Sequence, residues 1–141
     1  SYFADKWIGK YIGFDIADEL LKRAPSRVER VIGDIEEVRP FEDKSVDIIL
    51  CFFVVLHIRD IKHLFEEAHR VLKDGGTMVV LHNAQRRSFI YTLPSDTFKI
   101  EDYHRRDAEV EESASNAWFS IDSIILEEDS THIATLYNMK T

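Results

Sequence analysis

The sequence predicts an α/β fold with a mostly parallel sheet, and three successive patterns between residues 46 and 83 predict it. A short apolar run at residues 46–53 suits a strand that is buried on both faces. The apolar residues then take helical spacing over residues 60–73, and a second apolar run follows at residues 77–82. A strand, a crossover helix and a strand make a βαβ unit, so we expect the two strands to be parallel.

Composition limits the class of protein. The chain has 141 residues, 45% hydrophobic and 31% charged, so we expect a single globular domain over residues 1–141. No apolar run approaches the ~20 residues that span a bilayer, so we expect no membrane partner. A net charge of −8 disfavours a general nucleic-acid-binding surface. The single cysteine, Cys51, excludes an internal disulfide, favours the cytoplasm, and suits a buried inert thiol.

The N-terminal part reads as two further strands and a helix. Residues 11–15 form a short apolar run that ends in Asp15, and residues 29–33 form a second run that leads into Asp34. Between them, residues 17–24 predict a helix that stops at Pro25.

The central helix is predicted in most detail. Asp60 is placed as its N-cap, and Gly75-Gly76 is placed as its stop signal. Four residues at helical spacing should cover one face of the sheet: Leu64, Phe65, Ala68 and Leu72.

The C-terminal part is predicted as a helix followed by a hairpin. Pro94-Ser95-Asp96 indicates a turn and a helix start, and residues 100–114 indicate a charged helix. Its three glutamates, Glu109, Glu111 and Glu112, are interpreted as a solvated face. Residues 118–126 and 132–139 predict a terminal antiparallel pair of strands.

Polar residues at strand ends are the candidates for a site, because open parallel sheets bind ligands at the carboxyl ends of their strands. Asp15 could grip the hydroxyls of a ribose, or it could cap the following helix; spacing alone does not decide. For Gly33-Asp34, a simple turn is the better interpretation from the residues alone. Arg86 and Arg87 could bind an acidic group of a substrate, although a solvated loop is the simpler interpretation.

Three runs of the sequence belong together: FEDKSVDIILCFFVVLHI, EEAHRVLKDGG and TMVVL. In this order they resemble the middle of class I S-adenosylmethionine-dependent methyltransferases. The helix end RVLKDGG matches the family's "RvLkpGG", with Asp74 where proline is common. His57 falls on the second histidine of the family's "vLHHv" segment, and Leu56 replaces the first. The resemblance implies a Rossmann-like, mostly parallel sheet with helices on both faces and a C-terminal antiparallel strand pair.

The resemblance also implies a cofactor, S-adenosylmethionine, with S-adenosylhomocysteine as its product. GFDIADELLKRA matches the family segment in which the acid at the end of a strand holds the ribose. On the matching positions, six residues are expected to bind the cofactor: Asp15, Ile16, Asp34, Ile35, Cys51 and Phe52. Asp34 would face the adenine amino group, and Ile35 would pack on the ring. No metal is implied.

His57 is the candidate catalytic residue, because imidazole can orient a substrate or remove a proton near neutral pH. A packing or hydrogen-bonded histidine at a helix start is an equally good interpretation. His82 and Asn83, at the end of the next strand, are weaker candidates. No N-P-P-[YF] follows the strand at 46–51, which disfavours amino-directed nucleic-acid and glutamine methyltransferases and favours a small-molecule acceptor.

The chain departs from the family at its start. The family's first strand and glycine-rich loop should precede Tyr11 by roughly thirty residues, and only ten precede it. We therefore expect an incomplete domain whose first strand is missing, and we expect the 141-residue chain alone to bind S-adenosylhomocysteine weakly or not at all.

Two rival functions stay open. The first is a non-catalytic methyltransferase-like module that binds a ligand or forms a homodimer. The second is a nicotinamide-dependent oxidoreductase, since an acid in the place of Asp15 also suits that class.

Overall fold

The computed structural model describes residues 9–37, 39–83, 90–93, 96–99, 103, 105–128 and 133–141. The chain divides into two units, Ser1–Pro40 and Phe41–Thr141, called here the N-terminal and the C-terminal unit. Each is described by itself.

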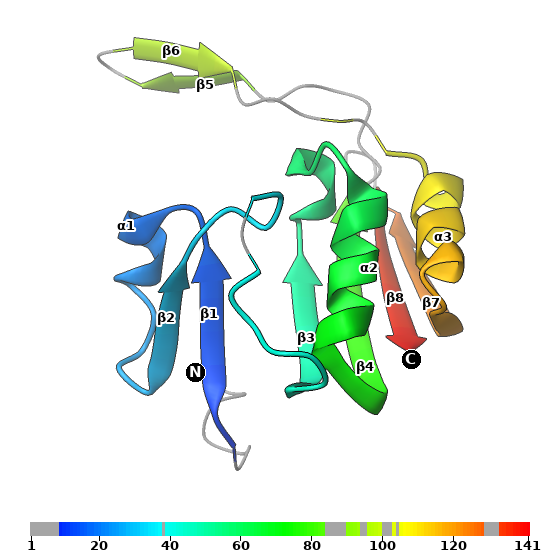
Figure 1. Cartoon of the computed structure of the whole chain (residues 1–141). Coiled ribbons are helices and arrows are strands. Elements are labelled where there is room, and N and C mark those ends of the chain that lie inside the picture. Colours follow the sequence, from blue (N-terminus) through cyan, green and yellow to red (C-terminus); the bar gives the residue numbers. More distant parts are fainter. Residues whose placement is uncertain are drawn as a thin grey trace. The chain divides into compact units, whose positions relative to one another are not determined.

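In the N-terminal unit, two strands and a short helix follow the predicted order. Strands β1 (Tyr11–Asp15) and β2 (Val28–Ile32) pair in parallel over their whole length, as predicted (Figure 1). Helix α1 (Asp18–Leu21) is shorter than the predicted 17–24. A Cβ on Gly13 would lie 3.2 Å from Leu21 Cδ2, so the glycine allows α1 to pack closely on β1.

The C-terminal unit contains a four-stranded sheet in the order β3-β4-β8-β7. Strands β3 (Val46–Phe52) and β4 (Leu72–Asn83) are parallel, as the βαβ pattern predicts. Strand β8 (Ile133–Lys140) lies antiparallel between β4 and β7 (Ser120–Glu128), which confirms the predicted terminal pair (Figure 1).

Helix α2 (Ile61–Val71) connects β3 to β4 after a 3-10 turn, η1 (Val55–His57). The predicted N-cap is confirmed, because Asp60 Oδ1 accepts a hydrogen bond of 3.1 Å from the His63 amide. The predicted apolar face is confirmed for Leu64, Phe65 and Ala68, which are buried, and is wrong for Leu72, which lies in β4.

The predicted end of this helix at residue 73 is wrong. α2 ends at Val71, and Leu72 is already extended and pairs with Val46 in the sheet. The next β3–β4 pair is Ile48 with Thr77, so residues 73–76 bulge opposite Asp47. A Cβ on Gly76 would lie 2.8 Å from the Lys73 carbonyl oxygen, so a close approach of two backbone segments in this bulge, not a helix stop, requires this glycine.

The region before the last helix was also predicted incorrectly. Residues 90–99 contain two short antiparallel strands, β5 (Ile90–Leu93) and β6 (Asp96–Lys99), in place of a helix start. Their β-branched and aromatic residues favour strands on either side of Pro94-Ser95. Helix α3 (Asp107–Asn116) begins later than the predicted residue 100.

The glutamates of α3 are more than a solvated face. Glu109 caps the start of α3, because the Arg106 amide donates to Glu109 Oε2 at 2.8 Å. This bond lowers the pKa of the Glu109 carboxyl below its ordinary value. Glu111 accepts a hydrogen bond of 3.4 Å from the Tyr137 hydroxyl, while Glu112 is exposed.

The core of the C-terminal unit lies on one face of its sheet, where α2 and α3 contact each other and the strands. Phe65 and Phe119 meet edge to face in this core, with ring centroids 6.1 Å apart. On the opposite face, Leu50 is 63% exposed. Among the described residues, no helix has both the length and the apolar character required to cross a membrane.

Candidate functional site

Asp15 and Asp34 lie together at the carboxyl edge of the β1–β2 sheet. The two strands are parallel and in register up to the pair Asp15 and Ile32. The ladder continues one step further, because the Gly33 amide donates to the Asp15 carbonyl oxygen at 3.1 Å. Asp34 follows directly. This edge therefore brings two of the predicted cofactor-binding acids side by side within one unit.

The side chain of Asp15 forms a local hydrogen bond. Its Oδ1 accepts from the Ala17 amide at 2.8 Å, just before α1 begins. Ala17 is the N-cap of α1, so Asp15 orders the chain before the helix but is not the N-cap itself. A carboxylate has two oxygens and about four acceptor positions, so this bond leaves capacity for a ligand.

Asp34 is in a turn, as the residues alone suggested. Its Oδ1 accepts from the Glu36 amide at 2.9 Å, and its carbonyl oxygen accepts from the Glu37 amide at 3.0 Å. Its carboxylate, like that of Asp15, is half-buried and is aimed by a single main-chain bond. The neighbouring apolar candidates differ in exposure: Ile16 is 68% exposed, and Ile35 is half-buried.

In the C-terminal unit, Cys51 and Phe52 end β3 and point to opposite faces, as successive residues of a strand must. Cys51 is buried in the core, and this burial raises the pKa of its thiol to about 12. Phe52 is 48% exposed on the other face. Of the two predicted cofactor contacts here, only Phe52 offers its side chain to solvent, because the Cys51 side chain lies in the core.

Phe53 has a backbone conformation that the sequence did not reveal. Its φ is +58°, in the left-handed region that side chains other than glycine rarely adopt. Its amide donates to the Leu81 carbonyl oxygen at 2.9 Å, which holds the strained residue beside β4. Phe53 and Val54 are both exposed and apolar. Strain of this kind is concentrated at functional sites, so the edge after β3 is the candidate substrate side.

His57 is the last residue of η1, and its side chain is exposed while its neighbours Leu56 and Ile58 are buried. Its amide donates to the Val54 carbonyl oxygen at 2.8 Å. A histidine on a short turn at a strand's carboxyl edge can meet a ligand that approaches this edge.

The weaker candidates, His82 and Asn83, end β4 at the same edge as the end of β3. His82 is completely buried, and its Nε2 lies 2.9 Å from the Arg105 carbonyl oxygen, so it joins the core rather than a ligand surface. Asn83 is half-buried. Arg86 and Arg87 lie outside the described residues.

Two half-buried acids, Asp107 and Glu111, lie near strand β8. Asp107 Oδ2 accepts from the Thr135 hydroxyl at 3.2 Å. Burial, together with Asp107 and Glu111, raises the pKa of the Tyr137 hydroxyl above its ordinary value, so it stays protonated and acts as a donor. Among the described residues, no group of three or more His, Cys, Asp or Glu side chains is arranged to hold a metal ion.

Comparison with known proteins identifies a family and a set of relatives. A family model described as a methyltransferase domain matches residues 1–80. A demethylmenaquinone methyltransferase from Tropheryma whipplei (strain Twist) is 35% identical over 86 residues, which cover 55% of this chain and 34% of the relative. The mitochondrial 2-methoxy-6-polyprenyl-1,4-benzoquinol methylase of Mus musculus is 42% identical over 55 residues, which cover 39% and 16%. The chain thus spans about a third or less of the length of these relatives.

Solved structures share the fold at low sequence identity. An S-adenosylmethionine-dependent methyltransferase from Mesorhizobium loti aligns over 99% of this chain and 84% of its own, with a TM-score of 0.78 and 14% identity. One from Methanosarcina mazei aligns over 92% and 81%, with a TM-score of 0.75 and 17% identity. A [4+2]-cyclase aligns over 99% and 70%, with a TM-score of 0.80 and 14% identity. The predicted Rossmann-like fold class is thereby confirmed.

Proposed function

The chain belongs to the methyltransferase domain family, and on this premise we propose that the full-length protein transfers a methyl group from S-adenosylmethionine to a small molecule. The observation that supports this most is the pair of half-buried carboxylates, Asp15 and Asp34, at one carboxyl edge of a parallel sheet. Each is oriented by one main-chain hydrogen bond and has acceptor positions left for a ligand.

These acceptors fit the donors of an adenosyl group. Ionised carboxylates only accept hydrogen bonds, and the ribose hydroxyls and the adenine amino group are donors. Asp15 would hold the ribose and Asp34 the amino group, with Ile16 and Ile35 as apolar contacts of the ring. Cys51 would contribute its backbone and Phe52 its ring.

The cofactor supplies an activated methyl group when bound, so the protein has to bind, align and exclude water. We propose that His57 orients the acceptor or takes its proton. The exposed apolar residues Phe52, Phe53 and Val54 would exclude water and favour an acceptor with an apolar ring. Two relatives are named for menaquinone and benzoquinol methylation, which agrees with such an acceptor.

Four finer features also stay predictions. A net charge of −8 and a buried, inert Cys51 favour a small-molecule partner and a cytoplasmic protein over nucleic acid and an oxidising compartment. A single methyltransferase domain and a homodimer are the other two; sedimentation of the full-length protein measures the oligomeric state.

Calorimetric titration with S-adenosylhomocysteine tests the proposed cofactor site. In the full-length protein, Asp15→Ala and Asp34→Ala should each weaken binding by about 1–3 kcal/mol, the value of a hydrogen bond to a charged group. Asp18→Ala is the matched control, because Asp18 lies in α1 and pairs with Lys22 at 2.8 Å. Unchanged affinity in a folded Asp15 or Asp34 variant would remove that residue from the site.

A non-catalytic or non-methylating protein is the second candidate, because a [4+2]-cyclase has the same fold. Transfer of a labelled methyl group from S-adenosylmethionine to any acceptor in a small-molecule extract separates the two. Tight adenosyl binding without transfer would favour the second candidate, and binding of a nicotinamide dinucleotide instead would favour an oxidoreductase.

A further inference from the structure

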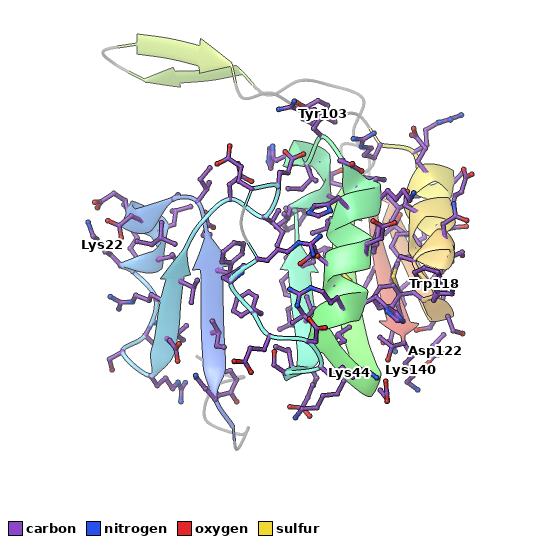
Figure 2. All side chains as sticks on the ribbon, viewed as in Figure 1. Lys22, Lys44, Tyr103, Trp118, Asp122 and Lys140 are labelled. Atoms are coloured by element: carbon purple, nitrogen blue, oxygen red, sulfur yellow. The ribbon has the colours of Figure 1, made fainter. Side chains whose placement is uncertain are left out.

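The segment before α3 hydrogen-bonds to the backbone on both sides of His57. On the N-terminal side, the Tyr103 amide donates to the Leu56 carbonyl oxygen at 2.7 Å. On the C-terminal side, Arg105 Nη2 donates to the carbonyl oxygens of Ile58 at 3.0 Å and Arg59 at 2.6 Å. The exposed His57 therefore lies between two stretches of backbone, and residues far along the chain hold each of them by hydrogen bonds. Figure 2 labels Tyr103 beside this turn.

Arg105 is itself held in place by a residue of strand β4. The completely buried His82 of β4 lies with Nε2 2.9 Å from the Arg105 carbonyl oxygen. A carbonyl oxygen only accepts, so this bond requires a hydrogen on Nε2 of His82. The Arg105 guanidinium also lies 5.5 Å from the centre of the Tyr103 ring, within the range of a cation–π contact.

The same segment is anchored to the sheet at its other end. Two residues after Arg105, Asp107 begins α3 and accepts a hydrogen bond of 3.2 Å from Thr135 of β8. Arg105 and Asp107 are thus fixed to β4 and β8, and the hydrogen bonds of Arg105 connect this anchored position to the turn after β3.

We infer that Arg105 is a positioning residue: it fixes the backbone on the C-terminal side of His57, while the Tyr103 amide holds the N-terminal side, and so it sets the direction of the His57 imidazole. This inference rests on the proposed function for the role of His57. The guanidinium suits the task because it is always charged and has five donors in a planar fork, so one side chain can hold two carbonyl oxygens. Its hydrogen bonds are to main-chain atoms of the turn, and it needs no contact with the ligand.

Amide hydrogen exchange in the full-length protein tests the inference without an acceptor. In Arg105→Met, exchange at the amides of His57 and Ile58 should accelerate on the order of tenfold, because their bonds to Val54 and Val55 belong to the turn that Arg105 holds. The amides between β4 and β8 should keep their rates. Arg106→Met is the matched control, since that neighbouring side chain is 82% exposed and contacts Glu109.

Further measurements separate a positioning role from a merely structural one. The NMR signals of the His57 ring should shift in Arg105→Met and keep their place in Arg106→Met, while the affinity for S-adenosylhomocysteine stays within twofold of the wild type. Arg105→Lys keeps the charge and much of the aliphatic part of the side chain, so it should give intermediate exchange rates. It replaces Arg105→Met in these measurements if that variant does not fold.

Three results would overturn the inference: equal acceleration at every amide, unchanged exchange at His57 and Ile58, or a large loss of S-adenosylhomocysteine affinity. The last would place Arg105 in cofactor binding. Failure of the wild type to bind S-adenosylhomocysteine would instead count against the proposed function, and the exchange rates would still decide the role of Arg105.

Discussion

At the scale of single residues, burial controls the reactivity of the Cys51 thiol. Thiolates are the reactive form of cysteine, and burial raises the pKa of this thiol from 9.0 to about 12. We expect a disulfide reagent at mildly alkaline pH to leave Cys51 unmodified in the folded protein and to modify it at once in denaturant. Modification without denaturant, at the rate of a free thiol, would contradict its burial.

The same shift predicts how stability depends on pH. The folded state keeps the thiol proton at pH values where the unfolded state loses it, so folding binds more protons there. The contribution of the protonated Cys51 thiol to the free energy of unfolding is present in full below pH 9.0. It is lost as the pH rises from there toward about 12. Cys51→Ala should remove this part of the alkaline loss of stability, which urea unfolding at several alkaline pH values measures.

The sequence predicted which candidate residues lie at strand ends, and it could not predict the residues that contact them from distant parts of the chain. Asp15 ends a predicted strand, and Asp34 and His57 come after one, so their place at a carboxyl edge follows from local pattern. Arg105 binds carbonyl groups 46 and 47 residues earlier in the chain. No local periodicity encodes such a contact, and the strained Phe53 gave no signal either, because its residue type is unusual at positive φ.

At the scale of elements, helix α2 depends on the side chain at its centre. Phe65 is completely buried against the sheet and Phe119, so Phe65→Ala should destabilise the protein by roughly 3–5 kcal/mol. Phe52→Ala is the matched control, because Phe52 is 48% exposed and should cost far less. Equal losses in urea unfolding would contradict the assignment of the core to one face of the sheet.

The C-terminal end of α2 is held by a second interaction. The guanidinium of Arg70 bonds to Glu67 at 2.9 Å and to the Phe41 carbonyl oxygen at 2.9 Å, and it pairs with Asp43. The hydrogen bonding of Arg70 to the Glu67 carboxylate is the main cause that raises the pKa of Arg70. Arg70 thus fastens the helix to the segment before β3.

Removal of Arg70 should therefore be costly. Arg70→Met breaks the ion pair with the Glu67 carboxylate, which is 7% exposed, at a cost near the lower end of the roughly 3–5 kcal/mol of a broken buried pair. Lys62→Met is the control, since Lys62 and Glu66 form an exposed pair at 3.6 Å. Similar free energies of unfolding for the two variants would contradict the fastening role.

Elements with strong periodicity were predicted well, and those set by tertiary contacts were not. The βαβ unit from β3 to β4 follows from its change of period. The end of α2 was misplaced by two residues because Leu72 is apolar at helical spacing, yet pairing with Val46 draws it into the sheet. Strands β5 and β6 were missed because Pro94-Ser95-Asp96 also suits a helix start.

At the scale of the whole molecule, the two units differ in how much core they contain. Among the described residues of the N-terminal unit, Leu21 alone is buried, whereas the C-terminal unit buries residues from α2, β4, α3 and β8. Amide protons of the β1–β2 ladder should therefore exchange through openings of lower free energy than those of the β4–β8 ladder. Native-state hydrogen exchange measures this, and equal protection of both ladders would show that the units open together.

Strand order in the larger sheet has a consequence for protein synthesis. β8 is the last strand of the sheet along the chain, yet it lies between β4 and β7. A ribosome adds about 5–20 residues per second, so the 57 residues from Asn83 to Lys140 take roughly 3–11 s. During that time β4 has been made while the partner for its second edge has not, and an unpaired strand edge is a template for wrong pairing. The nascent chain is thus most exposed to misassembly between the synthesis of β4 and that of β8, and a chaperone acting in this interval would protect the edge of β4.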